Sequence, residues 1–278
     1  MPMMSSVLRT AKHAIPAAAL VILGVCSKAS GQAINVESMV QDHGHRIEDT
    51  TLMIKRQSDG QLWVSNPKRA KQRFSPASTS KIPHTLIALD SGVATPDTVF
   101  KWDGVRRSVR AWNSDHTLPS AFETSAVWVY QQIARTAGQQ TMSDGLDRLE
   151  YGNATVGSID HLTTYWLDGT LRISAAGQIK FLSRLAQEHL PISRATYAAA
   201  KAIMVSDQTD RWVMRSKTGW RYNKNGMDIG WFVGWLDCGP ETYVFAMNLD
   251  MPDTRYLSKR KEITYAVLRD IGAFDCAG

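Results

Sequence analysis

The sequence lacks several features that would assign it to common classes of hydrolase or metalloprotein. Its 278 residues include only three cysteines, and no C-x-x-C pair or cysteine–histidine set has the spacing of a zinc site. The H-E-x-x-H motif of zinc hydrolases and the G-x-S-x-G motif of α/β-hydrolases are both absent. We therefore expect no metal site in this protein.

A strong charge of one sign is also missing. The formal net charge is +6, but residues 1–32 contain three basic residues and no acidic one. The rest of the chain then carries 29 basic and 26 acidic residues, which leaves a net charge of +3. So weak a field does not indicate nucleic acid as a partner.

The N-terminal segment has the order of a secretory signal peptide. Arg9 and Lys12 form a basic region, residues 14–25 are apolar, and small residues follow. The apolar run is too short to span a bilayer comfortably. We predict a signal peptide over residues 1–32, cleaved after Gly31 or Ala33, with export to the periplasm and no stable membrane association afterwards. A retained membrane anchor is the alternative.

Two cysteines remain beyond this segment. Cys26 belongs to the predicted leader, whereas Cys238 lies in a predicted turn and Cys276 lies near the end of the chain. An oxidising compartment would allow the latter two to pair. Spacing alone cannot place their Cα atoms within bridging distance, so the sequence leaves the pairing open.

The pattern of elements predicts one α+β domain over residues 33–278. Strand patterns occupy residues 51–57, 61–66, 211–216, 229–236 and 242–249, and helical patterns lie mainly between them and at residues 255–271. We expect an antiparallel sheet lobe from about residues 33–75 and 205–278, flanked by helices. Residues 76–204 are expected to form a mostly helical lobe.

Ser78 and Lys81 form an S-x-x-K motif where a loop enters a predicted helix. A serine hydroxyl is a weak nucleophile and needs a base nearby, and residues i and i+3 share one face of a helix. The helix N-terminus adds free N–H groups and a positive dipole end. By itself the motif is common, and an N-cap serine followed by a solvent-exposed lysine is the simpler interpretation.

A K-T-G motif, comprising Lys217, Thr218 and Gly219, follows a predicted strand. The cation and hydroxyl can bind a carboxylate, and a residue without a side chain lets a substrate lie close. S-x-x-K followed by K-T-G is a motif set of serine enzymes that react with penicillins.

Further motifs in the correct order make the resemblance more specific. S-x-V occurs at Ser125 and Val127, and Y-G-N at residues 151–153. With these motifs, residues 50–272 resemble the class D (oxacillinase-type) serine β-lactamases. The resemblance implies a β-lactamase/transpeptidase-like fold and hydrolysis of penicillin-type antibiotics, which confers resistance. One departure is Ser80, which stands where the family usually has phenylalanine.

The resemblance also implies the chemistry of the base. In that family the S-x-x-K lysine, here Lys81, becomes N6-carboxylysine, so carbon dioxide or bicarbonate is needed and no other cofactor is expected. Carbon dioxide adds to a neutral amine, and burial among apolar groups lowers a lysine pKa. Val127 would supply apolar wall, and Trp166 resembles the family tryptophan whose indole N–H holds the carbamate.

The remaining roles follow from the same resemblance. Ser125 would pass a proton to the β-lactam nitrogen, and the backbone N–H groups of Ser78 and Trp220 would form the oxyanion hole. Arg260 aligns with the arginine that binds the substrate carboxylate, although Lys259 and Lys261 flank it and leave this register open.

Two other functions share these motifs. A penicillin-sensing receptor domain stays acylated and normally follows a large membrane-embedded portion, whereas only the predicted leader precedes this domain. A D,D-peptidase acting on cell-wall peptides would be expected to carry S-x-N instead of S-x-V. We therefore expect a hydrolase of small β-lactams, as a monomer or homodimer; the sequence does not predict which β-lactams it prefers.

Overall fold

The computed structural model describes residues 32–43, 46–224 and 226–276. Except for Gln32, the predicted signal peptide lies outside these ranges. Across the described ranges, none of the helices combines the length and the apolar character needed to cross a membrane.

Within the described residues, strands from both ends of the chain form one seven-stranded sheet of order β1-β3-β2-β7-β6-β5-β4. The strands are β1 (Ile34–Asn35), β2 (Thr50–Arg56), β3 (Leu62–Val64), β4 (Val205–Gln208), β5 (Trp212–Arg221), β6 (Asp228–Cys238) and β7 (Glu241–Met251). Neighbouring strands are antiparallel except β1 and β3, which are parallel. The sheet is therefore mixed, because the chain enters through a short extra edge strand that the sequence pattern did not indicate.

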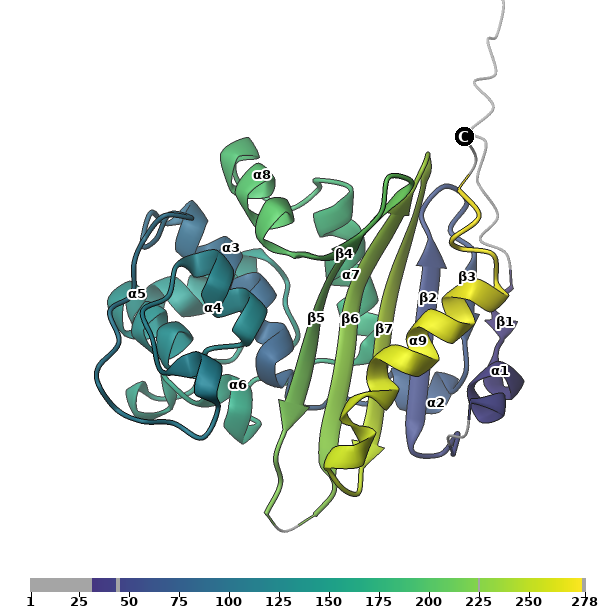
Figure 1. Ribbon diagram of the computed structural model, residues 1–278, viewed down its shortest axis with the longest axis horizontal. Coiled ribbons are helices and arrows are strands. Elements are labelled where there is room, and N and C mark those ends of the chain that lie inside the picture. The colour runs from purple at the N-terminus through teal and green to yellow at the C-terminus, as the bar shows by residue number, and fades with distance from the viewer. Residues whose placement is uncertain (1–31, 44–45, 225, 277–278) are drawn as a thin grey trace, which may run out of the picture.

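Helices cover the sheet and form a second lobe beside it (Figure 1). They are α1 (Glu37–Asp42), α2 (Pro67–Ala70), α3 (Lys81–Asp90), α4 (Leu118–Thr124), α5 (Val127–Arg148), α6 (Tyr165–Asp168), α7 (Ala175–Ala186), α8 (Arg194–Ile203) and α9 (Lys259–Asp270). Short 3₁₀ helices lie at η1 (Ala77–Ser80), η2 (Arg110–Trp112), η3 (Ile159–His161) and η4 (Thr254–Leu257). Helix α9 packs on β6 and β7, while α7 packs on β2 and β7.

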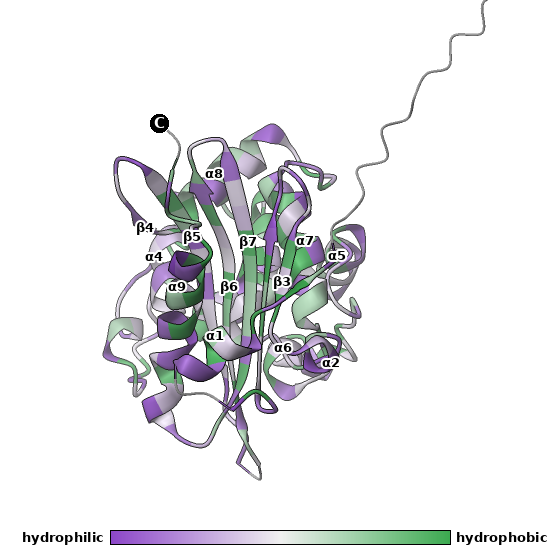
Figure 2. Cartoon of the chain, turned by 90° about the vertical axis from the view of Figure 1, so that its right-hand side faces the viewer, coloured by the Kyte–Doolittle hydropathy of each residue, from purple (hydrophilic) through white to green (hydrophobic). Residues whose placement is uncertain are grey.

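Strand β6 is buried on both faces, which explains its nearly continuous apolar sequence. Trp231, Val233 and Trp235 belong to the core shared with the helical lobe and α7. Phe232 and Leu236 alternate with them and belong to the core beneath α9. In Figure 2 the apolar colour follows the central strands and α7, while α9 is banded. Burial of each large apolar side chain contributes about 1.5–3 kcal/mol to the stability of the fold. The predicted α+β architecture is confirmed.

The helix predicted to begin at Ser78 is divided into two parts. Residues 77–80 form the 3₁₀ turn η1, and α3 begins at Lys81. Oγ1 of Thr79 donates to the Pro76 carbonyl and Oγ of Ser80 to the Ala77 carbonyl, each at 2.7 Å. Because these bonds connect residues three apart, they favour the tighter turn.

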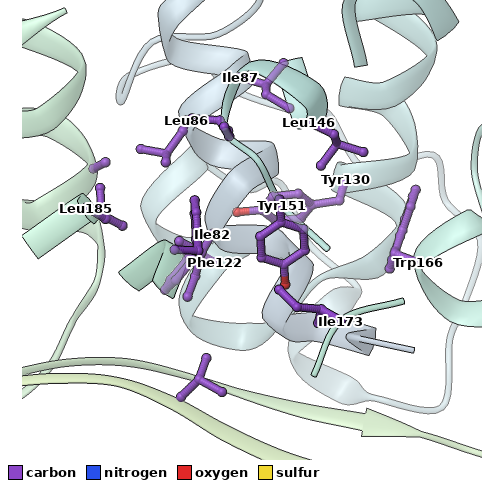
Figure 3. Close-up of a cluster of buried hydrophobic side chains, with 14 of the residues drawn as sticks. Ile82, Leu86, Ile87, Phe122, Tyr130, Leu146, Tyr151, Trp166, Ile173 and Leu185 are labelled. Carbon is purple, nitrogen blue, oxygen red and sulfur yellow. The ribbon is translucent and has the colours of Figure 1, made fainter. Parts of the chain in front are cut away.

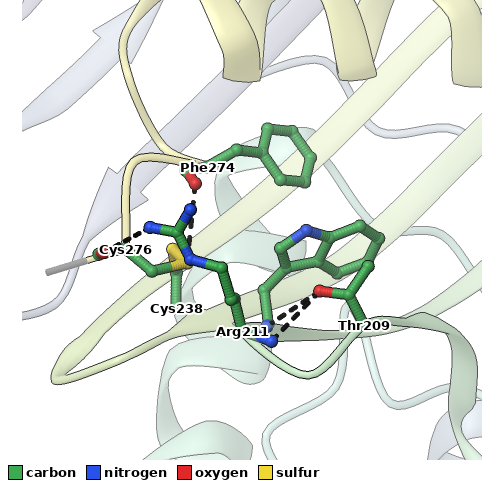
Figure 4. The surroundings of a disulfide bond; sticks show 6 residues. Thr209, Arg211, Cys238, Phe274 and Cys276 are labelled. Atoms are coloured by element: carbon green, nitrogen blue, oxygen red, sulfur yellow. Dashed lines mark hydrogen bonds between the residues drawn. A yellow bond between two sulfur atoms is a disulfide. The ribbon is translucent and has the colours of Figure 1, made fainter. Parts of the chain in front are cut away.

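Cys238 and Cys276 form a disulfide, which settles the pairing that the sequence left open (Figure 4). Their Cα atoms are 4.9 Å apart. Nη2 of Arg211 donates to the Cys276 carbonyl at 2.8 Å, and the ring of Trp212 packs edge-on against Phe274. These contacts fix the C-terminal segment to the ends of β5 and β6.

Candidate active site

Ser78 and Lys81 meet at the junction of η1 and α3. Nζ of Lys81 lies 3.0 Å from Oγ of Ser78. The Lys81 side chain is fully buried, whereas Ser78 is partly exposed. Burial, reinforced by the charge of Lys217, holds the pKa of Lys81 well below its ordinary value. The pair therefore combines an accessible hydroxyl with an amine that favours its neutral form.

Figure 3 shows aromatic and apolar side chains of the helical core, including Tyr130 of α5 and Ile82, the residue after Lys81 on α3. Nζ of Lys81 lies 5.0 Å from the centre of the Tyr130 ring. Val127 is the first residue of α5, one turn before Tyr130 and on the same helix face. The burial that lowers the Lys81 pKa thus comes from α5 as well as α3.

Trp166 is fully buried in the same core, at the edge of the cluster in Figure 3. Its carbonyl accepts a 2.7 Å hydrogen bond from Oγ of Ser75, and the carbonyl of Ser75 accepts one of 2.9 Å from Nε1 of Trp231. These bonds connect Trp166 to the turn that carries Ser78. Its own Nε1–H has no hydrogen-bond partner among the described residues, so a buried donor is available for an acceptor.

Strand β5 carries the K-T-G residues along a partly free edge. The described pairing of β4 with β5 ends at Arg215, so the segment from Lys217 to Trp220 faces η1. An added Cβ on Gly219 would lie 2.9 Å from the carbonyl oxygen of Pro76. The absence of a side chain here allows β5 to approach the turn that holds the serine.

Lys217 is buried at the wall of this site. Burial lowers its pKa to about 7, and the nearby cations Arg260 and Lys261 contribute. Nζ lies 5.6 Å from the centre of the Phe122 ring. This lysine is therefore cationic only up to about neutral pH.

The three consecutive cations at the start of α9 occupy different environments. Arg260 is buried, and its Nη1 donates to the Gly219 carbonyl at 2.6 Å. Lys259 forms an exposed ion pair with Glu262 at 2.7 Å, and the exposed Lys261 lines the cavity beside Lys217. Of the three, Arg260 alone bonds to the K-T-G backbone, which favours the register predicted for it.

A cavity of about 440 Å³ opens between α4 and β5. Lys217, Thr218 and Phe122 are among its lining residues. Ser125 caps the C-terminal end of α4 in the left-handed region, with φ of 59°, three residues after Phe122. Trp220 lies at the outer end of the free β5 segment, 41 % exposed, and its indole donates to Asp228 at 2.7 Å.

The structure adds residues that the motifs did not indicate. His84 lies one turn after Lys81 and is fully buried, and its ring packs on Trp166 with centroids 4.8 Å apart. The spacing of three residues from Lys81 was the available signal. Ser80, where the family usually has phenylalanine, is also fully buried. Within the described ranges, no three His, Cys, Asp or Glu side chains could hold a metal ion.

Comparison with known proteins identifies the family. The family described as penicillin binding protein transpeptidase domain matches residues 44–269. Beta-lactamase OXA-48 of Klebsiella pneumoniae is 43% identical over 211 residues, which cover 75% of this chain and 78% of that protein.

Solved structures agree with this comparison. The class D β-lactamase YbXI from Nostoc superposes with a TM-score of 0.82 at 34% identity, covering 86% of this chain and 99% of that one. FUS-1 (OXA-85) of Fusobacterium nucleatum gives 0.80 at 33% identity, covering 84% and 97%. With the Ser78–Lys81 pair and the K-T-G strand in place, these matches show that the chain belongs to the class D serine β-lactamases, which hydrolyse β-lactams.

Proposed function

We propose that this β-lactamase uses Ser78 as nucleophile and Lys81, carboxylated on Nζ, as the general base. The observation that carries the proposal is the position of Lys81, fully buried with Nζ 3.0 Å from Oγ of Ser78. Carbon dioxide adds only to a neutral amine, and burial favours that form.

The residues around Lys81 fit a carbamate. An anion buried there needs hydrogen-bond donors, and Nε1–H of Trp166 is a buried donor without a partner among the described residues. When present, the carbamate supplies the base for both acylation and deacylation. The apolar wall from Val127 and Tyr130 limits the access of bulk water to it.

The chain's own groups then account for the steps. Oγ of Ser78 loses its proton toward Lys81 and bonds to the β-lactam carbonyl carbon. Backbone N–H groups of Ser78 and Trp220 stabilise the oxyanion. As the ring C–N bond breaks, Ser125 delivers a proton to the departing nitrogen. Water, losing a proton on the Lys81 side, hydrolyses the ester and regenerates Ser78.

Substrate recognition rests on the cations beside β5. Lys217, Thr218 and Arg260 would bind the carboxylate that penicillins carry next to the ring nitrogen. Gly219 would let the substrate lie along the free segment of β5 between Lys217 and Trp220. The backbone N–H of Trp220, the second proposed oxyanion donor, belongs to this same segment, which faces the turn that carries Ser78.

Bicarbonate dependence tests the proposal. Turnover of a chromogenic cephalosporin is expected to fall in degassed buffer without bicarbonate and to recover when bicarbonate is added. Lys81→Ala should be inactive under both conditions. A single burst without turnover would indicate a sensor-type protein, and indifference to bicarbonate would refute the carbamate.

We also propose that the enzyme is exported to the periplasm and confers β-lactam resistance, as the predicted leader implies. A susceptible bacterium expressing the full chain should survive higher penicillin concentrations than one expressing Ser78→Ala. Activity should be released by osmotic shock. Activity confined to the cytoplasm would contradict export.

A further inference from the structure

His84 is the most unusual buried polar group near the nucleophile. It lies three residues after Lys81 on α3, is fully buried, and so shares the Lys81 face of the helix. Burial, together with the charge of Lys81, lowers the His84 pKa to about 3, so the ring is neutral in the working range of the enzyme.

Aromatic rings fix the orientation of the imidazole. The His84 ring meets Trp166 edge-to-face at 85°, with centroids 4.8 Å apart. The centroid of the Tyr165 ring lies 5.4 Å from that of His84, and the centroid of the Tyr130 ring lies 6.3 Å from it. Since Nζ of Lys81 lies above the same Tyr130 ring, Lys81, His84 and Trp166 share one aromatic enclosure.

The hydrogen bonds of His84 define which nitrogen is available. Nε2 lies 2.7 Å from Oη of Tyr165, and burial raises the pKa of that phenol, so Tyr165 keeps its proton and can donate it to Nε2. A neutral imidazole that accepts at Nε2 carries its proton on Nδ1. That Nδ1 has no partner among the described residues.

Two buried nitrogen atoms without partners among the described residues therefore belong to rings that pack on each other in the enclosure of Lys81. They are Nε1 of Trp166 and Nδ1 of His84, and both are donors when Tyr165 donates to Nε2 of His84. Buried donors without acceptors are costly, and a functional acceptor is a common reason for them. A carbamate on Lys81 has two oxygen atoms, so it could accept one hydrogen bond from each ring.

We propose that His84 is a positioning residue for the proposed function, with Nδ1–H donating to one oxygen of carboxylated Lys81 while Trp166 donates to the other. Tyr165 holds the imidazole in the required tautomer through Nε2. This arrangement goes beyond the tryptophan contact and stabilises the carboxylated form of Lys81 through a second donor.

Three variants separate this role from simple packing. His84→Asn keeps an N–H near the Nδ1 position, His84→Gln keeps one near Nε2, and His84→Phe keeps only the ring. The readout is the ¹³C NMR signal of the Lys81 carbamate during titration with ¹³C-bicarbonate. The His84→Gln and His84→Phe variants should raise the half-saturating bicarbonate concentration at least about tenfold, as expected for the loss of one hydrogen bond to a charged group. The His84→Asn variant should raise it no more than roughly threefold, because it keeps the donor.

A packing role predicts the reverse order, with Phe tolerated and Asn impaired, and that result would overturn the inference. A wild-type protein without a carbamate signal would refute the proposed function and this inference together. A wild-type signal with indifferent variants would refute this inference alone. Should a variant fail to fold, ¹⁵N-histidine NMR of the wild type decides: Nδ1 must carry the proton, and its shift must move when bicarbonate is removed. A proton on Nε2 contradicts the arrangement.

Discussion

Nη1 of Arg260 donates a 2.6 Å hydrogen bond to the carbonyl oxygen of Gly219, which connects α9 directly to the K-T-G segment of β5. Nε of the same side chain donates to the Leu257 carbonyl at 2.7 Å. Gly230 leaves the space for this path, because a Cβ there would lie 2.9 Å from Cδ of Arg260. The guanidinium is thus fixed beside the strand along which the substrate is proposed to bind.

Replacing Arg260 should therefore impair substrate binding more than replacing either neighbour. Arg260→Ala is expected to raise KM for a penicillin about 10- to 100-fold, the effect of losing a hydrogen bond to a charged group worth about 1.5–3 kcal/mol. Lys259→Ala is the matched control, since its exposed pair with Glu262 contributes little. Steady-state kinetics therefore test whether Arg260 is the residue that binds the substrate carboxylate. An equal rise in KM in the Arg260→Ala and Lys259→Ala variants would contradict that assignment.

The titration of Lys217 should limit the activity of the enzyme at alkaline pH. Its pKa is lowered to about 7 by burial and by Arg260 and Lys261, so the ammonium form is present below pH 7 and is lost as pH rises above it. Attraction for a substrate carboxylate weakens in the same direction. We expect kcat/KM to decline above pH 7, by at most about tenfold per pH unit.

Lys261→Gln tests the cause of that limit. Removing this charge should raise the Lys217 pKa and shift the decline to higher pH, because one contribution that disfavours the ammonium form is gone. The measurement is kcat/KM between pH 6 and 9 with excess bicarbonate, for both proteins. Profiles that coincide would show that the charge of Lys261 does not contribute to this limit.

Short-range motifs allowed much of the site to be predicted. Ser78 and Lys81 are separated by one helical turn, so their contact follows from local geometry. Lys217, Thr218 and Gly219 directly follow the strand predicted over residues 211–216, and they continue it, because β5 extends to Arg221. Such contacts need no knowledge of distant packing.

Long-range contacts were beyond the sequence for a physical reason. The Cys238–Cys276 bond depends on how α9 returns across the sheet, which spacing does not fix. Burial of Arg260 between two exposed lysines depends on the same packing. The approach of Trp166 to His84 depends on helix α6, which begins 81 residues after the histidine, so no local pattern indicated it.

The disulfide should stabilise the fold without affecting chemistry. It joins residues separated by 38 positions, and a closed loop of that length restricts the unfolded chain by about 4 kcal/mol in the chain-entropy account. Cys238 lies seven residues, or roughly 23 Å, along β6 from Trp231, whose indole donates to the Ser75 carbonyl beside the Ser78 turn. The double variant Cys238→Ser/Cys276→Ser should unfold at lower urea concentration with kcat unchanged. A large loss of kcat in the folded variant would mean that the C-terminal segment positions the site.

Gly219→Ala should damage catalysis through the backbone instead of through a lost side chain. The new Cβ would lie 2.9 Å from the Pro76 carbonyl oxygen and 3.1 Å from Cγ2 of Thr79, and the backbone oxygen cannot rotate away. Strand β5 must then retreat from η1, which separates the proposed oxyanion donors of Ser78 and Trp220.

The expected result is a fall in kcat of about 10²- to 10³-fold, as when one oxyanion donor is lost. Gly60→Ala, at a turn where nothing lies within 4 Å of the added Cβ, is the control for adding a methyl group to a glycine. It should lose some stability, because φ at Gly60 is +77°, but keep its kcat. Acylation of Ser78 can be measured by mass spectrometry. A normal acylation rate in the folded Gly219→Ala protein would show that the oxyanion donors do not depend on this close approach.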